Sequence, residues 1–90
     1  MPIIAGGGGV LCVAWAAVGA RLACGDESKK VTVLDASSGE KVWEATLGGR
    51  VLSVAFSSDN SKVVAGVGDL DTESGNVTML DASSGEVVWE

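Results

Sequence analysis

The chain contains no histidine and only two cysteines, Cys12 and Cys24. A zinc site closed by protein ligands takes four Cys or His side chains, so this pair is too small to form one. A nucleophilic cysteine needs a neighbouring base, most often histidine, and the sequence offers none. We therefore name no catalytic, cofactor-binding or metal-binding residue, expect no cofactor, and predict that the protein is not an enzyme.

Proline occurs once, and basic residues are missing from the last third of the chain. A single proline and a hydrophobic content of 47% are typical of a folded rather than a disordered chain. No Lys or Arg follows Lys62, although six acidic residues do, and the net charge is −6. Nucleic acid binding requires basic side chains against phosphates, so we do not expect nucleic acid as a partner.

Charged residues are also missing between Pro2 and Ala20. A secretory signal peptide carries basic residues near its start, and none precedes Arg21. Five glycines make the segment less apolar than a membrane helix. The run from Gly6 to Gly9 lacks the Gly-Lys-Ser/Thr ending of a phosphate-binding loop, which favours a connector. We expect no membrane partner and a cytoplasmic location.

One stretch is written twice. Residues Val31–Glu44 read VTVLDASSGEKVWE, and Val77–Glu90 read VTMLDASSGEVVWE, with two differences. Upstream, Val10–Trp15 matches Val51–Phe56 at an offset of 41, whereas the later copies are offset by 46. The second copy therefore contains an insertion of five residues, which falls within 66–76. An internal repeat of this length indicates a repeat architecture.

Each copy of the repeat predicts four short antiparallel strands. The apolar, β-branched runs suit strands, and the Asp-Ala-Ser-Ser-Gly segment suits a tight turn. We expect Gly39 and Gly85 at positive φ, with the carboxylates of Asp35 and Asp81 capping the turns. The expected strands cover residues 10–15, 20–25, 31–35, 40–46, 51–56, 62–67, 76–81 and 86–90.

This pattern resembles the WD-repeat β-propeller, whose blades are four-stranded sheets of about 40–45 residues. Val51–Gly66 is similar to the first two strands of such a blade, and Leu80–Asp81 stands where the family has Trp-Asp. The Gly-His dipeptide of the family is absent. Leu34–Trp43 also resembles the hairpin of quinoprotein-like propellers, in which an acidic residue and a Gly turn accompany a Trp that packs between blades.

Both resemblances imply an all-β fold of two four-stranded antiparallel blades, an incomplete propeller. Residues 1–9 form a Gly-rich segment equivalent to the tail of an outer strand. Blade 1 covers 10–46, an inter-blade turn covers 47–50, and blade 2 covers 51–90. Two blades leave apolar sheet faces uncovered. We therefore expect a part of a longer propeller or a homo-oligomer of three or four chains, with six or eight blades.

Three smaller features of the sequence are candidate sites. Asp69–Gly75 alternates acidic residues with a glycine, but it does not match a calcium loop and suits a solvated loop. Cys12 and Cys24 fall on neighbouring strands; free thiols are expected, and a disulfide is the alternative because antiparallel pairing could bring them together. The aromatic pairs Trp15/Phe56 and Trp43/Trp89 occupy matched positions, which indicates packing between blades.

The resemblance implies a non-catalytic module that mediates protein–protein interaction or scaffolding. Its expected partners are other proteins or copies of itself. The alternatives are a fragment of a quinoprotein-like propeller enzyme, which would need a cofactor site enclosed by several blades, and a gene fragment without independent function.

Overall fold

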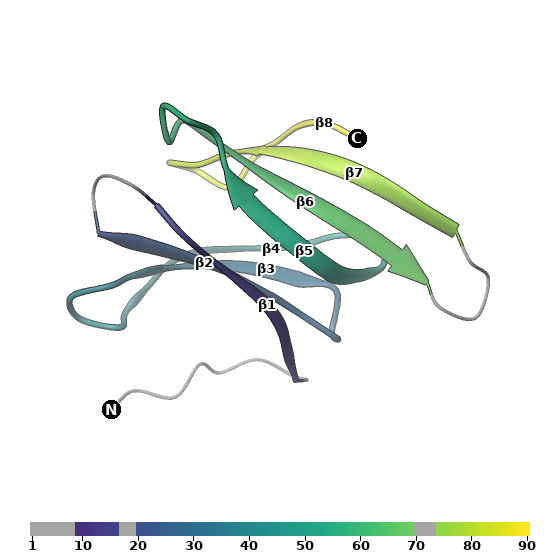
Figure 1. Cartoon of the computed structure of the whole chain (residues 1–90), viewed down its shortest axis with the longest axis horizontal. Coiled ribbons are helices and arrows are strands. Elements are labelled where there is room, and N and C mark those ends of the chain that lie inside the picture. The colour runs from purple at the N-terminus through teal and green to yellow at the C-terminus, as the bar shows by residue number, and fades with distance from the viewer. Residues whose placement is uncertain (1–8, 17–19, 70–73) are drawn as a thin grey trace.

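The computed structural model describes residues 9–16, 20–69 and 74–90, and all its regular elements are β-strands. They form two sheets of four strands each (Figure 1). The first sheet contains β1 (Val10–Trp15), β2 (Arg21–Asp26), β3 (Lys30–Asp35) and β4 (Lys41–Thr46). The second sheet contains β5 (Arg50–Phe56), β6 (Lys62–Asp69), β7 (Ser74–Asp81) and β8 (Val87–Trp89). All eight expected strands are present, and no helix in the described ranges could span a membrane.

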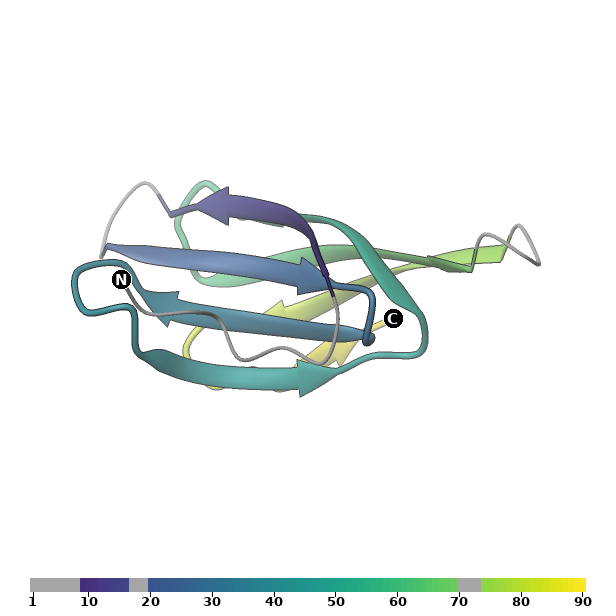
Figure 2. The same ribbon diagram turned by 90° about the horizontal axis from the view of Figure 1, so that it is seen from below.

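Each sheet is a meander in which every strand pairs antiparallel with the next one along the chain. Figure 2 shows β1 to β4 side by side in this order. β-bulges lie between Val10 and Cys12 and, in the second sheet, between Val51 and Ser53. A second bulge recurs between β3 and β4 and between β7 and β8. The two sheets therefore share their irregularities as well as their strand order.

The core lies between the two sheets. Because side chains alternate along a strand, each sheet has two faces, and one face of each sheet is turned toward the other sheet. Val31, Val33 and Trp43 come from the first sheet, and Val51, Val63 and Leu80 come from the second. Strand β5 makes most of the contacts across the interface, with β1 and β2. Burial of this apolar surface, at roughly 25 cal/mol per Å², holds the sheets together.

The inserted residues lengthen one hairpin. β6 and β7 have eight residues each, whereas β2 and β3 have six, and their pairing runs to Asp69 opposite Ser74. Figure 2 shows this hairpin extending beyond the other strands. The expectation of a solvated loop over residues 69–75 is therefore wrong at both ends, because strand pairing continues into it. Residues 70–73, the middle of the rejected calcium loop, lie outside the described residues.

Candidate interaction surfaces at the junction of the two sheets

The two Asp-Ala-Ser-Ser-Gly turns have the same geometry. Gly39 and Gly85 lie at φ 77° and 80°, which an L side chain rarely adopts. Asp35 Oδ1 accepts hydrogen bonds from the Ser37 amide (2.9 Å), the Ser37 hydroxyl (2.6 Å) and the Ser38 amide (3.2 Å). Asp81 accepts the equivalent bonds from Ser83 and Ser84. The predicted turn is confirmed in both copies.

These hydrogen bonds lower the pKa of both carboxyl groups, because they favour the charged form. The Ser37 hydroxyl is the main cause at Asp35, and the Ser83 hydroxyl is the main cause at Asp81. The same effect acts in the turn between β5 and β6, where the hydroxyl of Ser57 and the amide and hydroxyl of Ser61 lower the pKa of Asp59. All three carboxylates are accordingly ionised at neutral pH.

Acidification is expected to weaken the fold through these groups. Their pKa is lower in the folded chain than the ordinary value of about 3.9, so the stabilisation is complete above that pH and is lost as the pH falls through the lowered pKa. Replacing Ser83 with alanine should raise the pKa of Asp81 and leave that of Asp35 unchanged. A carboxyl ¹³C NMR titration measures both, and an unmoved Asp81 pKa would contradict the hydrogen-bond assignment.

Trp43 joins the two sheets. Its indole Nε1 donates a hydrogen bond of 2.8 Å to the carbonyl oxygen of Ala82, in the turn between β7 and β8. A Cβ atom placed on Gly85 would lie 2.6 Å from Trp43 Cε3, so the indole lies against the glycine itself. Trp43 is 8% exposed, whereas Trp89, its equivalent in the second repeat, is 49% exposed. The predicted packing between blades is therefore observed for Trp43 and leaves Trp89 at the surface.

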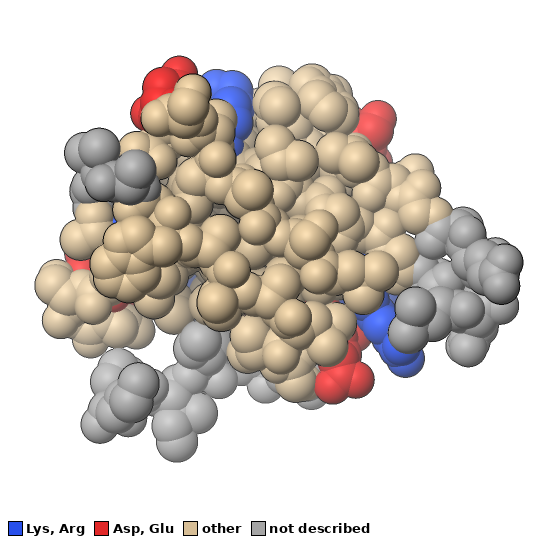
Figure 3. Space-filling model, viewed as in Figure 1, with Lys and Arg blue, Asp and Glu red and all other residues tan. Residues whose placement is uncertain are grey.

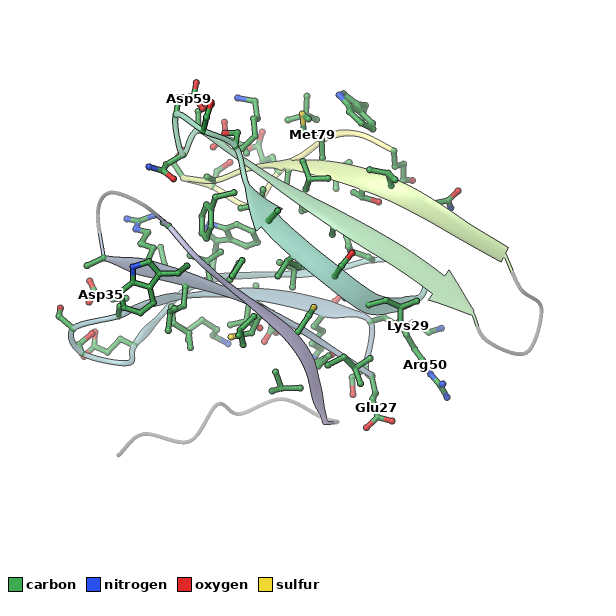
Figure 4. The ribbon with its side chains drawn as sticks, viewed as in Figure 1. Glu27, Lys29, Asp35, Arg50, Asp59 and Met79 are labelled. Atoms are coloured by element: carbon green, nitrogen blue, oxygen red, sulfur yellow. The ribbon has the colours of Figure 1, made fainter. Side chains whose placement is uncertain are left out.

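The junction is open at the turn end and forms a groove of about 450 Å³. Arg21 and Ala16 line it from the first sheet; Phe56, Lys62 and Asp81 are among the residues that line it from the second. Figure 4 places Asp35 and Asp59 at this end and Lys29 and Arg50 at the opposite end of the strands. We define this space as the junction groove. Sequence reasoning did not find it, because its walls come from both repeats.

Cys12 and Cys24 are free thiols. In the register of β1 and β2, Cys12 lies opposite Gly25, and Cys24 lies opposite Val13. The two sulfur atoms therefore belong to opposite faces of the sheet, and the alternative of a disulfide between them is wrong. Burial raises the pKa of both thiols, which keeps them protonated at neutral pH.

Asp26 is a buried carboxylate that the sequence analysis did not single out. Its Oδ1 atom accepts hydrogen bonds from the amides of Ser28 (2.9 Å) and Lys30 (3.1 Å) and so shapes the turn between β2 and β3. The sequence pattern that could have predicted this role is an Asp at a strand end followed two residues later by Ser, which is common in turns. The described residues contain no group of three or more potential metal ligands.

The sheets and their repeated turns define two neighbouring blades of a β-propeller. Residues 4–90 match the family model described as outer membrane protein assembly factor BamB, and the chain belongs to this family. No curated protein sequence matches it. The first sheet is hereafter blade 1, and the second is blade 2.

Solved propellers share the fold. BamB from Moraxella catarrhalis has a TM-score of 0.76 and 28% identity, and the match covers 89% of this chain and 23% of that one. The structure of the RRP9 WD40 repeats has a TM-score of 0.77 and 17% identity, and the match covers 93% of this chain and 26% of that one. Saccharomyces cerevisiae Sqt1 has a TM-score of 0.74 and 17% identity, and the match covers 89% of this chain and 19% of that one. The chain thus spans about a quarter or less of these propellers, and both predicted resemblances are confirmed.

Proposed function

We propose that the two blades form a non-catalytic interaction module that holds an acidic segment of another protein in the junction groove. The observation that carries the proposal is the pair of cations, Arg21 and Lys62, which line the groove together with Phe56. The description of the family, an outer membrane protein assembly factor, names a protein that acts on other proteins and supports the same class of function.

The two cations retain hydrogen-bond donors for a ligand. In the strand register Arg21 lies opposite Asp35, and Lys62 lies opposite Asp81. Those carboxylates already accept hydrogen bonds from their own turns. The ion pairs of the described residues are Lys30–Glu44 and Lys41–Glu44, and neither involves the groove. A carboxylate from a partner can therefore accept charge-assisted hydrogen bonds from both cations.

The size and the lining of the groove suit part of a polypeptide. About 450 Å³ lies within the usual range of ligand sites, and the groove is open to solvent along the junction. Phe56 supplies an apolar side chain beside the cations, and Asn60, Ser61 and Ser83 add polar groups. An extended segment that alternates acidic and apolar side chains would match both features.

The test is fluorescence anisotropy with a labelled peptide that alternates glutamate and leucine. We expect this peptide to bind, with affinity falling as salt rises because the cations are partly exposed. The double variant Arg21→Gln/Lys62→Gln should bind at least about tenfold more weakly, since a hydrogen bond to a charged group contributes about 1.5–3 kcal/mol.

Two controls make the result specific. The double variant Lys29→Gln/Arg50→Gln removes the same charges at the far end of the strands and should bind as the unaltered chain does (Figure 4). A peptide with lysine in place of glutamate should not bind. Equal affinity for the two peptides, or equal losses in the two double variants, would contradict the groove as the binding site.

A further inference from the structure

Each blade contributes one set of residues to the contact between the blades. The equivalents of both sets, in the other repeat, lie on the outer faces of the molecule. We define the leading face as the outer face of blade 2 and the trailing face as the outer face of blade 1. Figure 4 shows Met79 pointing away from blade 1, on the leading face. Its strand partner there is Trp89. In blade 1 the equivalent pair is Val33 and Trp43, which faces blade 2.

The first contact inside the junction is between a side chain and a glycine. Val51 of blade 2 packs directly on Gly25 of blade 1, where any added Cβ would overlap Val51 Cγ1. Beside it, the Cys12 thiol donates a hydrogen bond of 3.6 Å to the carbonyl oxygen of Val51. The absent side chain of Gly25 thus provides the space that Val51 fills.

The leading face has an equivalent glycine position, but no described side chain packs on it. Gly66 and Ser53 are the equivalents of Gly25 and Cys12, and they are strand partners as Gly25 and Cys12 are. A hollow of about 340 Å³ lies over them, with Leu52 and Val77 among its lining residues. Among the described residues, a Cβ atom added to Gly66 meets only Ser53 within 4 Å, and none of them takes the place that Val51 has at Gly25.

The side chain that matches this hollow lies on the trailing face. Val10 is the equivalent of Val51, and it is 46% exposed whereas Val51 is 0% exposed. Val13 and Trp15 continue the same face of β1, and both are exposed; their equivalents Val54 and Phe56 pack against the core. Figure 3 shows the side between the two outer faces, where β1 and β5 lie at the front; uncharged side chains cover its middle and charges sit at its edges.

The second contact inside the junction is the tryptophan described above, Trp43 against the turn from Asp81 to Gly85. Trp89 on the leading face has the same place in its repeat as Trp43 and is exposed. The turn from Asp35 to Gly39, which belongs to blade 1, has the same sequence and hydrogen bonds as the turn that receives Trp43. Its Ala36 carbonyl is the equivalent of the Ala82 acceptor.

We infer that a second copy of this chain docks head-to-tail, its trailing face on the leading face of the first. Val10 of the second copy fills the hollow over Gly66, and the Ser53 hydroxyl donates to the Val10 carbonyl. The Trp89 indole lies on Gly39 of the second copy and donates to its Ala36 carbonyl. This surface is separate from the wall of the junction groove, so the inference does not rest on the proposed function.

Head-to-tail contacts of this kind use two different surfaces and close into a ring when the rotation allows. Closed propellers hold about 4–8 blades, and three or four copies would supply six or eight of them. The lengthened β6–β7 hairpin extends past the end of the sheet (Figure 2). The hollow over Gly66 is open to solvent.

The experiment is light scattering coupled to size exclusion on the 90-residue chain, over a range of micromolar concentrations. We expect a species of three or four times 9.0 kDa. Assembly should also shift the tryptophan emission to shorter wavelength and reduce its quenching by acrylamide, because Trp15 and Trp89 become buried.

Gly66→Val is the principal variant, because its side chain occupies the hollow without touching blade 1. It should reduce the assembled fraction at least tenfold and keep the β-sheet circular dichroism. Trp89→Ala should do the same. Gly48→Val is the matched control, since a Cβ at Gly48 meets no atom of the described residues within 4 Å, and it should assemble normally.

A folded 9.0 kDa monomer at all concentrations would overturn the inference. Assembly that survives both Gly66→Val and Trp89→Ala would overturn it too, and so would a symmetric dimer of twice the chain mass. The monomeric Gly66→Val variant should still bind the acidic peptide. Loss of assembly and loss of peptide binding are therefore separate results, and each tests its own proposal.

Discussion

Replacing Trp43 with alanine is expected to lower the free energy of unfolding by about 3–5 kcal/mol. The side chain is buried between the blades, lies against Gly85, and donates to the Ala82 carbonyl. Its removal leaves a cavity and an acceptor without its donor. Domains of this size have a total stability on the order of 5–15 kcal/mol, so the variant should be largely unfolded on mild heating. Urea denaturation followed by circular dichroism measures the change.

Trp89→Ala is the internal control for this result. The two tryptophans occupy the same position of nearly identical hairpins, but Trp89 is exposed. Measured in the Gly66→Val background, where self-association does not contribute, its truncation should cost less than about 1 kcal/mol, as is usual for surface positions. Equal losses for the two substitutions would contradict the central place of Trp43 in the junction.

Gly25→Val should destabilise the chain by about 3 kcal/mol, the upper end of the usual cost of overpacking. The new side chain would overlap Val51, and its Cβ would lie 2.7 Å from Cys12 Sγ. Both neighbours belong to strands held by pairing on either side, so the blades must separate to admit it. Thermal unfolding followed by circular dichroism provides the measurement.

The comparison is again with the equivalent residue. Gly66→Val introduces the same side chain into the same type of strand, on a face without a neighbouring blade in the described chain. At a dilution where both chains are monomeric, we expect an unfolding midpoint close to that of the unaltered chain. If Gly25→Val unfolds at the same temperature as Gly66→Val, then Val51 does not require the space over Gly25.

Much of this fold follows from the repeat. Two copies of Asp-Ala-Ser-Ser-Gly between β-branched runs specify a hairpin, and the structure has both hairpins with Gly39 and Gly85 at positive φ. The local signals sufficed because these turns are closed by hydrogen bonds within five residues. The strand extension into residues 69 and 74 had no such signal, since glycine and acidic residues are poor strand formers.

The interaction surfaces were harder to predict, because they depend on which face each residue occupies. A bulge shifts the alternation of side chains, and the bulge after Val10 places this residue on the outer face with Val13 and Trp15. The same alternation of side chains places Cys12 and Cys24 on opposite faces of the first sheet. Arg21 and Lys62 lie 41 positions apart in sequence and meet only when the blades stack.

The lengthened β6–β7 hairpin has a consequence for how the chain folds. The β3–β4 and β7–β8 hairpins are so similar in sequence that each could pair with the wrong second strand, and such exchanges are characteristic misfolding events of repeat proteins. Strand β6 pairs with β7 through Gly68 and Asp69, opposite Gly75 and Ser74. The six-residue β3 begins at Lys30, the equivalent of Asn76. An exchanged hairpin would therefore place no strand residue opposite Gly68 and Asp69 and would leave backbone groups of β6 unpaired. We therefore expect the difference in strand length to favour the pairing of each hairpin with its own blade during folding.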